Sequence, residues 1–186
     1  FNLVRLGVMW PGVYPAQGQV NETYLDVVEG LVNRLGEAGI YTLIDMHQDV
    51  LSAFMCGEGI PDWAVPVKVP GVPPFPIPVT DVAYERNADG YVDRATCLEK
   101  TFASYYNSNQ AQVIFECLFT KGCNPFQDPT DPDAEPEKEV VLQDELKRFW
   151  TTVAGRFADS QYVLGYDLIN EPVNANTIAH PEYRNS

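Results

Sequence analysis

The 186-residue chain has little positive charge, with 12 Lys and Arg residues against 26 Asp and Glu and a formal net charge of −14. This balance argues against nucleic acid, because proteins neutralise its phosphates with Lys and Arg. It also argues against electrostatic binding to anionic lipid surfaces. No apolar run approaches the ~20 residues that a membrane-spanning helix needs. We therefore expect no nucleic-acid partner, no transmembrane segment in this chain and a neutral substrate.

Several signatures of chemistry are missing too. The chain has no glycine-rich phosphate loop, since Gly57-Glu58-Gly59 is too short to form one, and no Ser or Cys nucleophile elbow. It holds only two His residues and no Cys-x-x-Cys pair. Because metal centres are usually built from clusters of such ligands, we expect no metal and no cofactor.

Four cysteines, Cys56, Cys97, Cys117 and Cys123, all fall between the second and third predicted strands. Two disulfides there would indicate an oxidising compartment, so we expect a secreted or lysosomal protein. Four cysteines allow three pairings, which the sequence does not decide, and free buried thiols are the alternative. Asn21-Glu22-Thr23 is an N-glycosylation sequon that fits the same compartment, although Asn21 also suits a helix N-cap.

The first 46 residues show the pattern strand, helix, strand. A mostly apolar strand over 2–9 carries Arg5, and a charged group in such a run usually has a partner. A helix is predicted from Asn21 to Ala38, ended by Gly39, before a second strand over 40–46. The short joints predict a right-handed βαβ unit. The helix should bury one face, made of Tyr24, Leu25, Val28, Leu31, Val32 and Leu35.

The third apolar strand comes only at 163–169, so residues from about 50 to 138 form a long insertion. Pro61 to Pro78 holds seven Pro and predicts an extended flap. Its Val side chains either pack against the rest of the protein or line a site for an apolar substrate. Helices are predicted over 94–106, 110–119 and 139–157. In the first two, the residues expected to face inward are Cys97, Leu98, Phe102, Phe115 and Leu118.

Polar residues follow the second and third strands where each strand ends. The third strand reads as buried on both faces and stops at Asn170-Glu171-Pro172, because Pro172 cannot continue a ladder. This places Asn170 and Glu171 at the carboxyl end of a parallel strand, where the chemistry of α/β barrels is found. The alternative is that the two residues merely form a turn.

The second strand ends in Asp45-Met46-His47-Gln48-Asp49, and period-2 alternation puts Asp45, His47 and Asp49 on one side. This trio could bind a metal or hydrogen-bond sugar hydroxyls, or His47 could be purely structural. After the first strand, the aromatic and turn-rich segment 10–15 is expected to be a loop, which either stacks on a sugar or packs on the rim.

These residue types suit glycoside hydrolysis. A glycosidic bond breaks through an oxocarbenium-like state and needs two carboxyl groups, one of which donates a proton. Glu171 could be that acid if its neighbours raise its pKa, and Asn170 could hydrogen-bond a sugar 2-hydroxyl. Arg5 and His47 come from other strands and could hold the sugar or the second carboxylate.

Four blocks of the sequence, at 4–12, 45–49, 57–63 and 165–172, resemble in the same order the endoglycoceramidases of glycoside hydrolase family 5. The resemblance implies a retaining enzyme that cleaves the linkage between the oligosaccharide and the ceramide of glycosphingolipids. It implies that Glu171 is the acid/base and Asn170 the neighbouring substrate contact. It further implies that His47 and Asp49 contact the first sugar, and that Arg5 braces a nucleophilic Glu lying outside this chain.

The fold class expected from this resemblance is α/β, a partial (β/α)8 TIM barrel of about three consecutive strands. Residues 1–186 would be part of one catalytic domain, with the remaining segments of the barrel as partner, because a whole barrel needs about 250 residues. We expect the fragment alone to be inactive. The alternatives are a cellulase- or mannanase-like glycanase of family 5 and a non-catalytic carbohydrate- or lipid-binding barrel.

Overall fold

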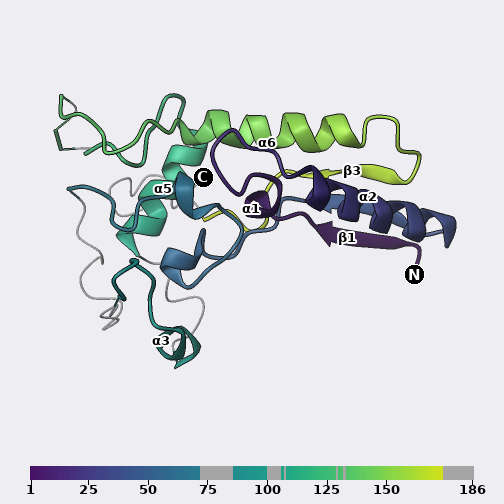
Figure 1. Ribbon diagram of the computed structural model, residues 1–186, viewed down its shortest axis with the longest axis horizontal. Coiled ribbons are helices and arrows are strands. Elements are labelled where there is room, and N and C mark those ends of the chain that lie inside the picture. Colours follow the sequence, from purple (N-terminus) through teal and green to yellow (C-terminus); the bar gives the residue numbers. More distant parts are fainter. Residues whose placement is uncertain (72–85, 100–105, 107, 129, 132, 174–186) are drawn as a thin grey trace, which may run out of the picture.

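The computed structural model describes residues 1–71, 86–99, 106, 108–128, 130–131 and 133–173. Its strands run parallel in a single sheet of order β1-β2-β3 (Figure 1). In this sheet Asp45 pairs with Gly7 on one side and with Asp167 on the other, so the strand ends are level. The α/β class with parallel strands is confirmed. The strands are β1 (Leu3–Gly7), β2 (Tyr41–Asp45) and β3 (Val163–Asp167).

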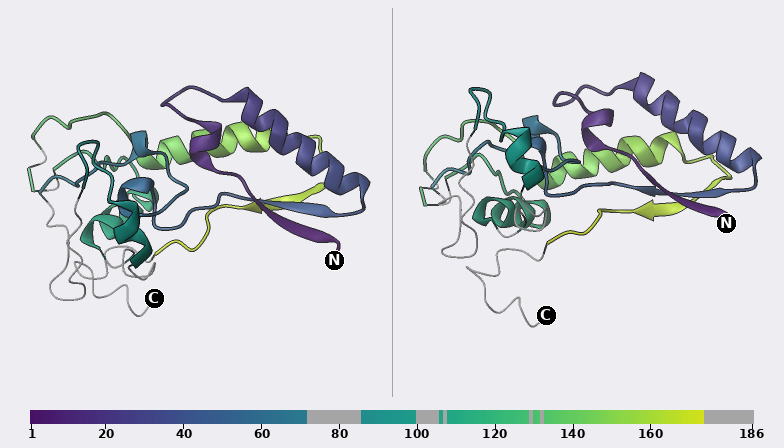
Figure 2. Two further views of the ribbon diagram at one scale, coloured as in Figure 1. Left: turned by 60° about the horizontal axis from the view of Figure 1, so that its bottom comes forward. Right: turned by 90° about the horizontal axis from the view of Figure 1, so that it is seen from below.

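Two long helices, α2 (Glu22–Glu37) and α6 (Leu142–Arg156), lie on one face of the sheet (Figure 2). The Asn21 side chain caps α2 by accepting a hydrogen bond from the Tyr24 backbone N–H at 3.1 Å. Gly39 follows the helix with a φ of +76°, a conformation that glycine adopts without steric cost. The predicted βαβ unit is therefore present over the first 45 residues.

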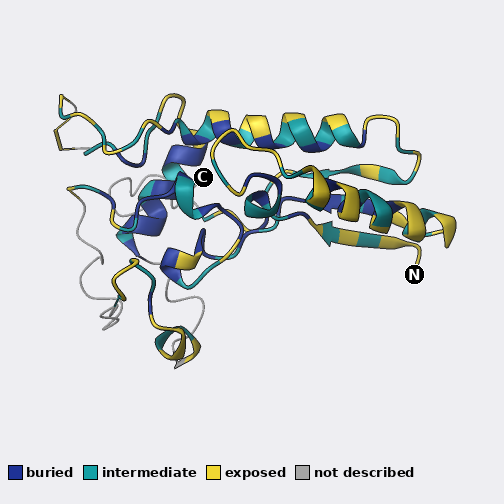
Figure 3. Cartoon of the chain, viewed as in Figure 1, coloured by how far each residue is buried: buried dark blue, intermediate teal, exposed yellow. Residues whose placement is uncertain are grey.

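The core lies between these helices and the sheet and continues into the insertion around α5 (Figure 3). Helix α2 buries Leu25, Val28 and Val32, which recur at the spacing of one helical face. Leu31 was expected among them but is 37% exposed, because it lies about 100° around the helix from Val32. From α6 the core receives Leu142, Phe149 and Val153, and from β2 it receives Ile44.

The other face of the sheet has no helix on it among the described residues. Along β1, Leu3, Arg5 and Gly7 are exposed and alternate with the half-buried residues between them. In and just after β3, Leu164 and Leu168 are 62% and 64% exposed. The expectation that the third strand is buried on both faces is therefore wrong for this structure, since α2 and α6 cover one face only.

The connection from β2 to α6 gathers beyond the carboxyl ends of the strands (Figure 1). Both predicted disulfides are present there, as Cys56–Cys97 and Cys117–Cys123, so all four cysteines are paired. The connection is built from the 3-10 helices Ala53–Met55 and Asp62–Ala64 and from helices α3 (Arg94–Glu99) and α5 (Asn109–Phe119). A short helix, α1 (Trp10–Val13), follows β1.

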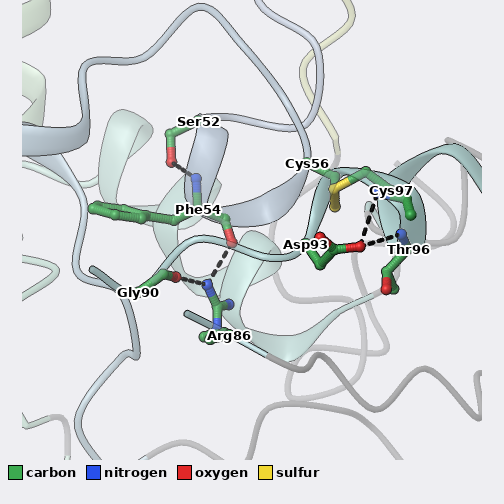
Figure 4. The surroundings of a disulfide bond; sticks show 9 residues. Ser52, Phe54, Cys56, Arg86, Gly90, Asp93, Thr96 and Cys97 are labelled. Carbon is green, nitrogen blue, oxygen red and sulfur yellow. Dashed lines mark hydrogen bonds between the residues drawn. A yellow bond between two sulfur atoms is a disulfide. The ribbon is translucent and has the colours of Figure 1, made fainter. Parts of the chain in front are cut away.

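Polar contacts hold the region around the Cys56–Cys97 disulfide (Figure 4). Arg86 Nη1 donates to the Phe54 carbonyl and to the Gly90 carbonyl, each at 2.6 Å. The Asp93 carboxylate accepts from backbone N–H groups at the start of α3. The disulfide therefore joins two segments that are also joined by hydrogen bonds.

Several expectations for the insertion need correction. Leu98 was expected to face inward but is 77% exposed, because α3 is short and is attached through its neighbour Cys97. Val65 and Val69 are buried in the core, so in the described part of the Pro-rich segment these side chains pack. Residues 72–85 of that segment and Phe102 lie outside the described residues.

Across the part of the chain that the structure describes, we find no helix with the length and apolar character that crossing a membrane requires.

Candidate functional site

Arg5 joins all three strands at their carboxyl ends. Its Nη2 donates to Asp45 Oδ1 at 2.9 Å and to Asn170 Oδ1 at 2.8 Å, while its Nε donates to Asp167 Oδ2 at 2.9 Å. The Asp45 side chain is only 1% exposed, so its charge requires a partner of opposite sign. The rigid fork of the guanidinium supplies one and fixes the strand ends relative to each other. The predicted partner of Arg5 is thereby found.

His47 is held between two carboxylates. Its Nδ1 lies 2.8 Å from Asp45 Oδ2 and its Nε2 lies 3.2 Å from Asp49 Oδ2. Burial by itself lowers the pKa of His47, but the hydrogen bonds and charges of the two Asp residues outweigh it and raise the pKa above its usual 6.5. Both ring nitrogens can donate only in the imidazolium form, which this environment therefore favours. The three residues lie together, as the alternation predicted.

Asn170 and Gln48 form a reciprocal pair beyond the ends of β2 and β3. Gln48 Nε2 donates to the Asn170 carbonyl at 2.6 Å, and Asn170 Nδ2 donates to the Gln48 carbonyl at 2.8 Å. The Asn170 backbone N–H also donates to the Met46 carbonyl at 3.0 Å. Both side chains are buried, so these bonds satisfy polar groups that water cannot reach. The strand pairing thus continues up to the residue before Glu171.

Glu171 differs from its neighbour in being exposed. Its backbone has a φ of +38°, which is uncommon for a residue other than glycine. Gln48 Nε2 reaches the Glu171 carbonyl at 3.3 Å, so the backbone on this side is tied to the locked pair. The structure therefore presents a carboxylate to solvent from a constrained backbone.

The insertion reaches the site through Tyr106. Its hydroxyl lies 3.5 Å from Asp49 Oδ1, the same oxygen that Asn170 Nδ2 approaches at 3.4 Å. The Tyr106 ring stacks against Phe115 of α5, with centroids 6.2 Å apart. Burial, with a further effect from the charges of Asp49 and Glu171, raises the pKa of Tyr106. The phenol is therefore a hydrogen-bond donor at the edge of the site.

His47, Asp49 and Glu58 are the described residues that come closest to a metal-binding group. One ligand atom from each lies within 4.8 Å of the others. Asp49 and Glu58 are also joined by two backbone hydrogen bonds, at 2.8 and 2.7 Å. His47 Nε2 already faces Asp49 Oδ2 at 3.2 Å, so a metal ion would have to separate this pair. We therefore assign the pair to hydrogen bonding.

The aromatic segment after β1 does not form a sugar-stacking wall. Trp10 is fully buried and lies against Trp63 and Phe149, at centroid distances of 6.3 and 5.9 Å. Tyr14 is buried as well. The segment folds as α1 rather than as a loop because Pro11, near the helix start, is pre-organised for helix and needs no N–H there.

Two residues of the site were missed by sequence reasoning. Asp167 lies inside the predicted third strand, and only its position opposite Asp45 in a parallel sheet would have placed it near Arg5. Gln48 was noted only as part of a motif. Its function depends on the backbone of Asn170, more than a hundred residues away, which no local pattern indicates.

The family model described as cellulase, glycosyl hydrolase family 5, matches residues 1–119, more than half of the chain. The chain belongs to glycosyl hydrolase family 5. The match covers β1, β2 and much of the insertion of this family 5 chain, and it ends before β3.

The family 5 chain is similar over nearly its whole length to endoglycoceramidases. Those of Hydra vulgaris and Cyanea nozakii are each 37% identical over 180 residues, which is 97% of this chain and 31% and 32% of those proteins. A solved structure of endo-glycoceramidase II from Rhodococcus sp., a ganglioside GM3 complex, matches with a TM-score of 0.63 and 28% identity over 92% of this chain and 32% of that chain. The chain thus spans about a third of the length of these relatives.

Proposed function

We propose that the complete protein is a retaining glycoside hydrolase that cleaves the oligosaccharide–ceramide linkage of glycosphingolipids. Membership of family 5 and similarity to endoglycoceramidases support this proposal, as does the ganglioside bound by the Rhodococcus structure. The observation that carries it is the exposed Glu171 directly after a buried Asn170 that is locked to Arg5 and Gln48.

In this proposal Glu171 donates a proton to the leaving oxygen of the ceramide and later removes one from water. Its exposure allows a substrate oxygen to reach it, while the bonded backbone fixes where the carboxylate begins. Asn170 Oδ1 accepts one hydrogen bond from Arg5, which leaves one lone pair for a sugar 2-hydroxyl. Such a contact strengthens as positive charge develops on the sugar ring.

The charged residues around Arg5 would receive the first sugar. His47 and Asp49 lie on the side of the strand ends where Asn170 also lies, and together they offer donors and acceptors for hydroxyl groups. Tyr106 adds a donor from the insertion. Arg5 keeps Asp45 and Asn170 in place, and in the complete enzyme it would also brace the nucleophile.

We further propose that β1, β2 and β3 are consecutive strands of a (β/α)8 barrel. Residues 1–186 would form part of one catalytic domain, with an insertion from about 50 to 138. The open face of the sheet would then become barrel interior, covered by the remaining strands, and those strands would supply the nucleophilic Glu. The two disulfides support a secreted or lysosomal location.

The decisive test is Glu171→Gln in the complete enzyme, with Glu37→Gln at the end of α2 as a matched exposed control. We expect turnover of a natural glycosphingolipid to fall by about 10²–10⁴-fold, because proton donation to the leaving group is lost. The glycosylation step should be spared with an aryl glycoside whose leaving group needs no proton. Equal losses on both substrates in a folded variant would contradict the assignment.

The rival within the family is a glycanase, and the family model's own description names cellulases. Comparing release of ceramide from glycosphingolipid with release of reducing ends from cellulose or mannan separates the two. A complete reading frame that lacks the second Glu would instead favour a binding protein. Residues 1–186 expressed alone should show no hydrolysis, because the nucleophile lies elsewhere.

A further inference from the structure

Asn21-Glu22-Thr23 is the one complete Asn-x-Ser/Thr sequon with a non-proline centre in the 186 residues. The proposed catalytic reaction makes no use of it. Asn21 is half-buried, while Glu22 and Thr23 are exposed. The four residues before Asn21, over 17–20, are exposed as well, so exposed residues stand on both sides of Asn21.

The helix cap uses the oxygen of the Asn21 amide and not its nitrogen. The oxygen of its side-chain amide accepts the hydrogen bond from the Tyr24 N–H that caps α2. An N-linked glycan is attached to the nitrogen of the same amide. Cap and glycan therefore occupy different atoms of Asn21, and the helix start does not have to change when the sugar is added.

The position is also separate from the candidate site. Asn21 begins α2, which covers one face of the sheet, as Figure 2 shows, whereas Arg5 is exposed on β1 together with Leu3 and Gly7, which alternate with the half-buried residues of that strand. A bulky glycan at Asn21 would thus stand on the outer layer of the fold. The helix start lies at the same end of the sheet as Glu171, because the Asn21 N–H donates to the Val13 carbonyl just beyond β1, but it belongs to the helix layer and not to the sheet.

From the sequon, the geometry of the cap, the exposed flanks and the two disulfides, we infer that Asn21 carries an N-linked glycan. The disulfides matter because the oxidising compartment in which they form is also where N-glycans are added. The sugar is a solubilising group on the helix-covered side of the molecule, and this conclusion does not depend on the proposed reaction.

The test is to secrete the complete protein from insect cells and to map its glycosylated asparagines. Peptide N-glycosidase digestion in ¹⁸O-labelled water, followed by mass spectrometry, should mark Asn21 as a labelled Asp in most copies of its peptide. Recovery of the Asn21 peptide from secreted protein mainly in unmodified form would overturn the inference. This measurement needs no variant, so it stands even if a substitution impairs secretion.

Variants then separate the sugar from the cap. Thr23→Ala removes the sequon and keeps the Asn21 amide, so the label should vanish while ceramide release stays unchanged. Thr23→Ser keeps both and should retain the label. A label that persists in Thr23→Ala would mean that the modification does not arise from this sequon, and that would also contradict the inference.

Discussion

Replacing Asn170 with Ala should be among the most damaging single changes to the fold. The substitution removes the donor to the buried Gln48 carbonyl at 2.8 Å, and an unsatisfied buried group costs about 1–3 kcal/mol. It also removes the acceptor for Arg5 at 2.8 Å, a charge-assisted bond worth about 1.5–3 kcal/mol. The Arg5 side chain is 40% exposed and would still pair with the carboxylates of Asp45 and Asp167 in the variant. The loss of its bond to Asn170 should therefore cost about 1.5 kcal/mol, the lower end of that range.

We therefore expect Asn170→Ala to lower the free energy of unfolding of the complete protein by about 2.5–4.5 kcal/mol, a large share of the 5–15 kcal/mol typical of proteins. Urea unfolding followed by circular dichroism measures this loss. Asn33→Ala on the exposed side of α2 is the matched control and should change stability by no more than about 0.5 kcal/mol.

Asn170→Asp shows which bond matters. It keeps an oxygen toward Arg5 but places a second oxygen against the Gln48 carbonyl, so the new carboxylate has a raised pKa in the folded state. Its penalty should be full at neutral pH and should shrink as pH falls toward about 4, where a protonated carboxyl can donate to that carbonyl. The reasoning is wrong if Asn170→Ala lowers the free energy of unfolding no more than Asn33→Ala does. It is also wrong if the loss of stability in Asn170→Asp does not change with pH.

Further expectations concern titration and the disulfides. Because the folded-state pKa of His47 is raised above 6.5, protonated His47 stabilises the enzyme below that pH, and the contribution disappears as pH rises through the higher folded pKa. His47→Gln should flatten this part of the stability–pH curve, and an unchanged curve would argue against it. Replacing Cys56 and Cys97 with Ser should cost about 4 kcal/mol and replacing Cys117 and Cys123 about 2 kcal/mol, since the loops they close span 41 and 6 residues. Chemical unfolding that finds the reverse order would contradict the loop argument.

Strand-end reasoning was sufficient to bring the candidate site together from sequence. Arg5, His47 and Asn170 each lie in or just after a predicted strand, and parallel strands align their carboxyl ends, so these residues had to meet. Trp10 could not be placed in this way. Its burial depends on Trp63 and Phe149, which come from the insertion and from α6.

The open face of the sheet was a different kind of error. The apolar composition of the third strand predicted burial on both sides, but burial depends on the neighbouring elements as well as on composition. Within the described residues, α2 and α6 supply neighbours for one face only, and Leu164 is left exposed. Composition indicates what a strand prefers, while the elements packed against it decide how far it is buried.

The positive φ of Glu171 opposes stability to the catalytic role proposed for this residue. Glycine adopts such a backbone freely, whereas a residue with a side chain is disfavoured there. A selection for heat resistance alone should therefore enrich glycine at this position. A screen for hydrolysis should hold the carboxylate in place. If Glu171 is the acid/base proposed above, a stability-guided redesign has to keep it, because the glycine that relaxes the backbone would remove the proton donor.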